Sequence, residues 1–83
     1  MADLEQAVLR FVAGEVFCPV ADVAAFIQRE TGGTPEAAAA TALHLLTEWE
    51  DRGWAETAEM DPAGQVSLTD RAFAELPWLP RQL

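Results

Sequence analysis

Positive charge is scarce in this chain, which has 5 Lys and Arg residues, all of them arginine, against 14 Asp and Glu, for a net charge of −9. Cysteine is scarcer still: Cys18 is the only one, so the chain can form neither an internal disulfide nor a metal cluster built from thiolates. No apolar run approaches the roughly 18 residues that a membrane-spanning helix requires, and the start of the sequence lacks the basic residues of a secretory signal. We therefore expect a cytoplasmic protein without a membrane segment.

Apolar residues are abundant, at 51% of the 83 residues, while 23% are charged. This composition is typical of a globular protein and differs from that of disordered chains, which are poor in hydrophobic residues and rich in charge. The length suits one domain, so we expect residues 1–83 to form a single unit. A domain of this size has little core from which to draw stability, and a partner or a second copy would help it.

Three helices are predicted from apolar residues that recur at spacings of three and four, over about residues 3–13, 19–31 and 35–52. The third begins after Thr34 as its cap, has Pro35 and Glu36 in its first turn, and is closed by Gly53. Its expected core face is Ala38, Ala42, Leu45, Leu46 and Trp49. The second and third helices, joined by a short turn that contains two glycines, match a helix-turn-helix pattern.

The segment after the third helix is predicted to form a β-hairpin over about residues 54–68, because Asp61, Pro62 and Gly64 suit the first, second and fourth positions of a type I turn. Thr69 is the expected cap of a short helix over about residues 69–76, and an apolar tail follows at 77–83. The fold class is therefore mainly α with a small β-hairpin.

Two segments, Leu46 to Trp54 and Val66 to Ala72, carry patterns that occur in known proteins. The first is similar to L-x-x-L-x-x-x-G followed by an aromatic or aliphatic residue, and the second to L-T-[DE]-x-[GA], both found in MarR- and PadR-like regulators. The resemblance covers about residues 4–76 and implies a winged helix-turn-helix with a three-helix core, a wing and a short C-terminal helix. Here Trp49 stands at a usual Leu and Ala72 at a usual Gly. The long dimerisation helices of those families are missing, which leaves the oligomeric state open.

In those families, DNA contacts fall on the outward face of the third helix and on the tip of the wing. The matching helix positions here are Glu36, Ala37, Ala40, Thr41, His44, Thr47 and Glu48. The matching wing-tip positions are Glu59, Asp61, Pro62, Ala63 and Gly64. Bases are read in the major groove by donors such as Arg, Lys, Asn and Gln, and this helix face offers none beyond His44 and two hydroxyls.

Charge opposes DNA binding more directly. Between Thr34 and Gly64 the chain has seven carboxylates against Arg52 alone, so six of its nine net negative charges lie there. DNA binding depends largely on cations that displace counterions from the phosphates, so this region should repel DNA. Folding could still bring two or three arginines together from the five elements that carry them: Arg10, Arg29, Arg52, Arg71 and Arg81.

Side chains suited to chemistry are few. His44 and Glu48 have the i and i+4 spacing of a metal-binding pair, but an exposed histidine beside a surface glutamate is far commoner, and no metal or other cofactor is expected. Ser67 falls inside a predicted strand and Cys18 lies next to Pro19, with no base indicated near either. We therefore do not expect an enzyme.

Apolar residues remain at both ends of the chain, where we expect self-association. A short domain cannot enclose all of a chain that is 51% apolar, and contiguous apolar remainders usually mark contact sites. Fold-back onto the domain is slightly favoured for the ring of Trp78, and docking on another chain for Leu79 and Leu83. The candidate contacts are Leu4, Val8, Phe11, Trp78, Leu79 and Leu83.

The sequence thus favours an acidic winged-helix protein used chiefly for contact with another protein, as a homodimer or as a subunit of a regulatory assembly. One alternative is a small DNA-binding transcriptional regulator that acts as an oligomer. Another is an acidic mimic of DNA, in which carboxylates on a helix face and a wing imitate phosphates, although such a face is usually only solubilising. Fold alone does not decide among these uses.

Overall fold

The computed structural model describes residues 2–15, 17–58 and 64–79, which form four helices and three strands. The helices are α1 (Ala2–Ala13), α2 (Val20–Thr31), α3 (Pro35–Asp51) and the short α4 (Asp70–Glu75). The strands are β1 (Cys18–Pro19), β2 (Ala55–Thr57) and β3 (Gln65–Leu68). The predicted fold class, mainly α with a small β-hairpin after the helices and a short helix at the end, is confirmed.

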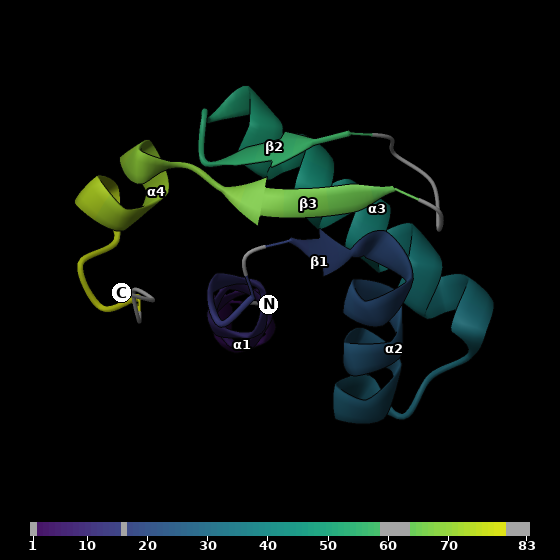
Figure 1. The fold of residues 1–83 in the computed structure, drawn as a ribbon. Helices are drawn as coiled ribbons and strands as arrows, with labels where there is room; N and C mark the ends of the chain where they lie inside the picture. Colours follow the sequence, from purple (N-terminus) through teal and green to yellow (C-terminus); the bar gives the residue numbers. More distant parts are fainter. Residues whose placement is uncertain (1, 16, 59–63, 80–83) are drawn as a thin grey trace.

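The small sheet lies across one side of the helical body (Figure 1). Figure 1 shows α1 beneath the sheet, α2 and α3 packed against each other toward one end, and α4 beyond the opposite end. The order α1, β1, α2, α3 and then a β2–β3 hairpin is compatible with a winged-helix layout. Within the described part of the chain, no helix has both the length and the apolar character needed to cross a bilayer.

Local capping interactions set the ends of the helices. The Thr34 side chain accepts a hydrogen bond from the backbone N–H of Ala37 at 3.1 Å, and Thr69 does the same for the N–H of Ala72 at 3.4 Å. At the other end of α3, Gly53 takes a left-handed conformation with φ of 78°, which costs glycine little and turns the chain into the hairpin. The expected caps and the closing role of Gly53 are therefore confirmed.

The sheet has one strand more than the predicted hairpin. β1 pairs antiparallel with β3, with Cys18 opposite Val66 and Pro19 opposite Gln65, and the strand order is β1, β3, β2. Pro19 was expected inside the second helix, but its ψ of 139° is extended and it stands just before α2. An edge strand tolerates proline because the missing N–H can lie on the unpaired side. A strand this short forms only through its distant partner, so local periodicity does not reveal it.

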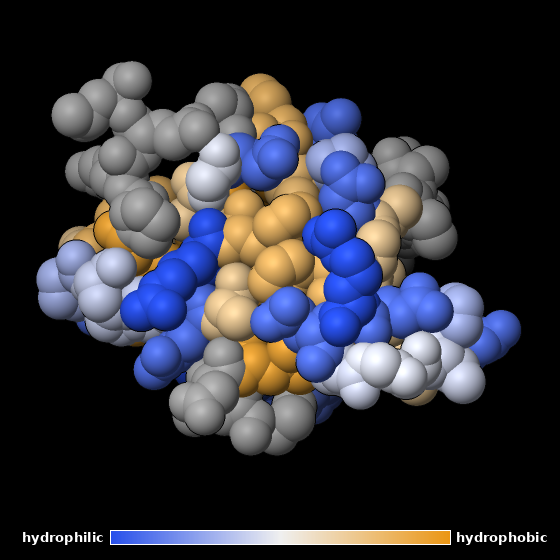
Figure 2. Space-filling model, turned by 90° about the horizontal axis from the view of Figure 1, so that it is seen from below, coloured by the Kyte–Doolittle hydropathy of each residue, from blue (hydrophilic) through white to orange (hydrophobic). Residues whose placement is uncertain are grey.

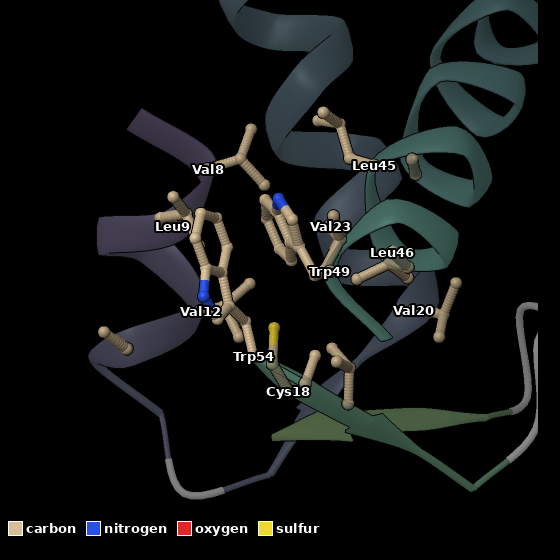
Figure 3. Packing of buried hydrophobic residues seen from close by; sticks show 14 of the residues in the cluster. Val8, Leu9, Val12, Cys18, Val20, Val23, Leu45, Leu46, Trp49 and Trp54 are labelled. Atoms are coloured by element: carbon tan, nitrogen blue, oxygen red, sulfur yellow. The ribbon is translucent and has the colours of Figure 1, made fainter. Parts of the chain in front are cut away.

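Trp49 and Leu46 lie at the centre of the core. Both side chains are fully buried, and Trp49 is the largest side chain that is completely enclosed. Figure 3 shows the Trp49 ring among side chains from α1 and α2, with Trp54 alongside. The predicted core face of α3 is confirmed throughout, and Leu43 at its edge is half-buried.

Replacing Leu46 by alanine should lower the free energy of unfolding by about 2 to 5 kcal/mol, because a fully buried Leu leaves a cavity that its neighbours fill only partly. Urea denaturation followed by circular dichroism measures the loss. The matched control is Leu43→Ala on the same helix, which should cost clearly less because Leu43 is half-exposed. Equal losses for the two variants would mean that α3 packs with a different face inward.

Candidate interaction surfaces

The predicted recognition positions share one outer face of α3. Glu36, Ala37, Ala40, His44 and Thr47 are exposed, and Thr41 and Glu48 are half-buried at the margin. His44 Nε2 lies 3.3 Å from Glu48 Oε1, and 66% of the His44 side chain is exposed. This is a surface pair within one helix, and such pairs contribute only a few tenths of a kcal/mol, about 0.2 to 0.5.

The acidic and basic side chains of α3 are unequal in number, with four carboxylates and neither arginine nor lysine. α3 carries Glu36, Glu48, Glu50 and Asp51, and its sequence contains no arginine or lysine. None of the four carboxylates is fully buried. The next arginine along the chain is Arg52, which lies just after the end of the helix. The outer face of α3 therefore presents carboxylates, with no arginine or lysine among them.

Folding does bring two arginines to the same end of α3. The Arg52 guanidinium lies 4.9 Å from the centre of the Trp54 ring, and the Arg71 side chain runs beside Gly53, so that a Cβ at Gly53 would lie 3.2 Å from Arg71 Cδ. Glu75 accepts hydrogen bonds from Arg71 Nε at 2.6 Å and from Trp54 Nε1 at 3.1 Å. The hydrogen bond from Arg71, followed by that from Trp54, holds the pKa of Glu75 below its usual range. The charge of Arg71 is thus largely offset.

The wing tip lies mostly outside the described residues: Glu59, Asp61, Pro62 and Ala63. Gly64, the remaining position of the predicted tip, is described and differs from the prediction. It is buried, and its carbonyl accepts a hydrogen bond from the backbone N–H of Val20 at 2.9 Å. Gly64 therefore anchors the hairpin to the start of α2, and it is not part of an exposed wing tip.

The outer face of the sheet exposes an aromatic ring that the sequence did not single out. Phe17 is 63% exposed, and together with Glu56 and Ser67 it lines a hollow of about 300 Å³. Phe17 directly precedes Cys18, which is buried. Phe17 stands just before β1, and it shares the hollow with exposed or half-buried residues of β2 and β3.

A second surface runs along α1 and α2. The rings of Phe11 and Phe26 stack with their centroids 4.6 Å apart, and both side chains are half-buried. Beside them is a shallow groove of about 500 Å³, lined by Phe11, Glu15, Asp22, Ala25, Gln28 and Arg29. Figure 2, which views the molecule from below, shows an apolar area bordered by hydrophilic residues. The α2 members of this surface were not among the predicted contact residues.

Two of the predicted contacts at the chain ends must be corrected. Val8 is fully buried and Leu79 is only 6% exposed, because both belong to the chain's own core, so neither is available for docking. The ring of Trp78 folds back onto the domain, where the Arg10 guanidinium lies 5.2 Å from the centre of the ring. This contact confirms the fold-back prediction. Leu4 and Phe11 are half-buried against the core, and Leu83 lies outside the described residues.

The candidate nucleophiles occupy protected positions. Cys18 is fully buried in the core, and burial, with smaller contributions from the charges of Glu15 and Asp22, raises the pKa of its thiol to about 12. Ser67 lies half-buried in β3. Among the residues that the structure describes, no three His, Cys, Asp or Glu side chains are grouped so as to hold a metal ion.

Comparison of the chain with protein-family models, with curated proteins and with solved structures gives no match.

The stability of the domain should decrease at alkaline pH through Cys18. Its thiol has a pKa of about 12 in the folded chain and 9.0 as the ordinary value, so this contribution is complete below about pH 9 and is lost as the pH rises toward about 12. Urea denaturation at about pH 8 and about pH 10.5 measures the loss. In Cys18→Ala the same rise in pH should cost less, whatever the variant's absolute stability. Equal losses in the two proteins would show that Cys18 does not titrate in this way.

Proposed function

We propose that this chain is a winged helix-turn-helix domain, resembling MarR- and PadR-like regulators, that serves mainly for contact with proteins in the cytoplasm, as a homodimer or as a subunit of a regulatory assembly. The layout of helices and sheet is compatible with such a domain. The two segments that resemble those regulators also meet in space, which supports this interpretation. Thr69 donates its backbone N–H to the carbonyl of Trp54 at 2.8 Å, and its hydroxyl donates to the carbonyl of Gly53.

The charge of α3 is the observation that carries the proposal. In a winged-helix regulator this helix would approach the phosphates of DNA, yet here it offers four carboxylates and neither Arg nor Lys. Affinity for DNA arises largely from cations that release condensed counterions, so such a helix lacks the main favourable contribution and adds repulsion. A protein surface imposes no such requirement. Contact with proteins is therefore the use that this charge distribution supports best.

A DNA-binding regulator is the second candidate, and one observation favours it. Arg52 and Arg71 both lie next to the Gly53–Trp54 turn at the end of α3, and a dimer would present this pair twice. Glu75 offsets one of the two charges through its 2.6 Å contact with Arg71. The remaining positive charge is small compared with the carboxylates of α3, so we rank this function below protein contact.

Random duplex DNA should bind poorly to the chain even at about 50 mM salt, a condition that exaggerates electrostatic attraction. Fluorescence anisotropy with a labelled duplex measures the affinity. Binding in the micromolar range or tighter that weakens steeply with added salt would contradict the proposed protein-contact function and support DNA binding.

A pair of charge variants tests whether the carboxylates of α3 are the reason for the weak DNA binding. Changing Glu36, Glu48 and Glu50 to Gln removes three charges from α3 and should strengthen DNA binding measurably. Changing Glu5, Glu15 and Glu30 to Gln removes the same charge from the α1 and α2 side and should change DNA binding less. If the two triple variants respond equally, net charge alone decides, and the position of the carboxylates on α3 is irrelevant.

A further inference from the structure

The exposed side of α2 carries a self-complementary row of residues. Asp22, Ala25, Phe26 and Arg29 occupy positions i, i+3, i+4 and i+7, which lie on one face of a helix. Asp22, Ala25 and Arg29 are exposed, and Phe26 is half-buried against Phe11. The row has an acidic residue at the start, apolar residues in the middle and a basic residue at the end. We call these four residues the α2 stripe.

The charges of the α2 stripe have no ion-pair partner among the residues that the structure describes. Neither Asp22 nor Arg29 takes part in a salt bridge among the described residues, where the pairs are His44–Glu48 and Arg71–Glu75. With a rise of about 1.5 Å per residue, Asp22 and Arg29 stand about 10 Å apart along the helix, too far to pair with each other. Both are free to pair with groups on another molecule.

A two-fold axis through the middle of the stripe would satisfy both charges at once. The midpoint between positions 22 and 29 falls between Ala25 and Phe26, which are the apolar members. Two such helices packed antiparallel bring the basic end of each against the acidic end of the other, and a two-fold interface uses the same patch on both subunits. Ala25, with its small side chain, allows close approach at the axis.

The distribution of charge also selects this face over α3 for contact between two copies. Two chains of net charge −9 repel each other, and the repulsion is strongest where carboxylates face carboxylates. α3 has four carboxylates and no arginine or lysine, whereas the groove beside the α2 stripe includes Arg29 together with Glu15 and Asp22. A strongly cationic partner would bind the acidic α3 more favourably than the mixed charges of the α1–α2 face. The α1–α2 face is therefore better suited to a second copy of the chain than to a cationic partner.

We propose that this protein forms a homodimer through the α2 stripe, with the two α2 helices antiparallel and Arg29 of each subunit paired with Asp22 of the partner subunit. The stacked rings of Phe11 and Phe26 extend the apolar centre of the interface onto α1. This inference rests on the proposed use of the domain for protein contact, and it specifies one partner and one surface.

Sedimentation velocity of the full chain over a range of concentrations tests the proposal. The parent should approach the mass of two chains as concentration rises. Ala25→Arg should stay at the mass of one chain, because a long cation at the axis meets its own copy. Ala40→Arg is the matched control, since Ala40 is also an exposed helical alanine but lies on α3, and this variant should still dimerise. Circular dichroism confirms that each variant is folded.

Charge reversal tests the pairing itself. Asp22→Arg and Arg29→Asp should each weaken dimerisation roughly tenfold or more, because each reversal converts two attractive pairs into two repulsive ones. The double variant Asp22→Arg/Arg29→Asp should recover most of the parent's affinity, since every pair is again opposite in sign. A merely structural effect of either substitution would persist in the double variant.

Two outcomes would overturn the inference: a parent that keeps the mass of one chain at every concentration, or an Ala25→Arg variant that dimerises like the parent. Neither requires DNA, so they are separate from the test of the proposed function. If the chain is a monomer and also fails to bind DNA, the proposed protein-contact function stands and only the α2 dimer is rejected. A dimer that binds DNA tightly removes the protein-contact function and keeps the interface.

Discussion

Burial of the Trp49 ring is the constraint on which the rest of this fold depends. The ring is the largest completely enclosed side chain, and it lies near the end of α3, among residues of α1 and α2 (Figure 3). Its Nε1 has no hydrogen-bond partner among the described residues, and a buried donor left unpaired costs about 1 to 3 kcal/mol. Only extensive apolar contact offsets that cost, so α1 and α2 must pack closely around this position. The direction in which the chain leaves α3 is then fixed as well, because the Trp49 carbonyl accepts the N–H of Trp54 at 2.8 Å.

The turn after α3 links the helical body to everything that follows. Gly53 reverses the chain with a positive φ, Trp54 becomes buried, and its carbonyl receives the N–H of Thr69 from the start of α4. Glu75 at the end of α4 then accepts from Trp54 Nε1. The hairpin between these points is therefore held at both ends by contacts to one turn. The segments Leu46–Trp54 and Val66–Ala72 are thus joined directly, because Thr69 donates hydrogen bonds to the carbonyls of Gly53 and Trp54.

The features that could be predicted from the sequence are those set by residues close together along the chain. Thr34 and Thr69 are recognisable as caps because the groups that they bond lie three residues away. β1 could not be predicted, since two residues become a strand only by pairing with β3. Val8 and Leu79 were assigned to contact surfaces because they are apolar and lie near the ends of the chain, but the sequence does not show which residues cover them in the fold. For the candidate site, the outer face of α3 followed from helical spacing, whereas the surface around Phe11 and Phe26 depends on how two helices pack.

The division of charge between the two sides of the molecule supports the proposed function. Helical spacing sorts α3 into an apolar face that the core requires and an outer face that the core leaves unconstrained, so the carboxylates there are not explained by folding. They weaken any approach to phosphates, and they also discourage two copies from meeting through α3. The α1–α2 side retains apolar area together with charges of both signs, and it includes Asp22 and Arg29 one heptad apart. A domain this small gains stability from additional buried surface, and this side can supply it by contact with a second copy without bringing the acidic helices together. On this view the acidity of α3 and the mixed character of α2 are two parts of one arrangement, in which one face is kept away from self-contact and the other is suited to it.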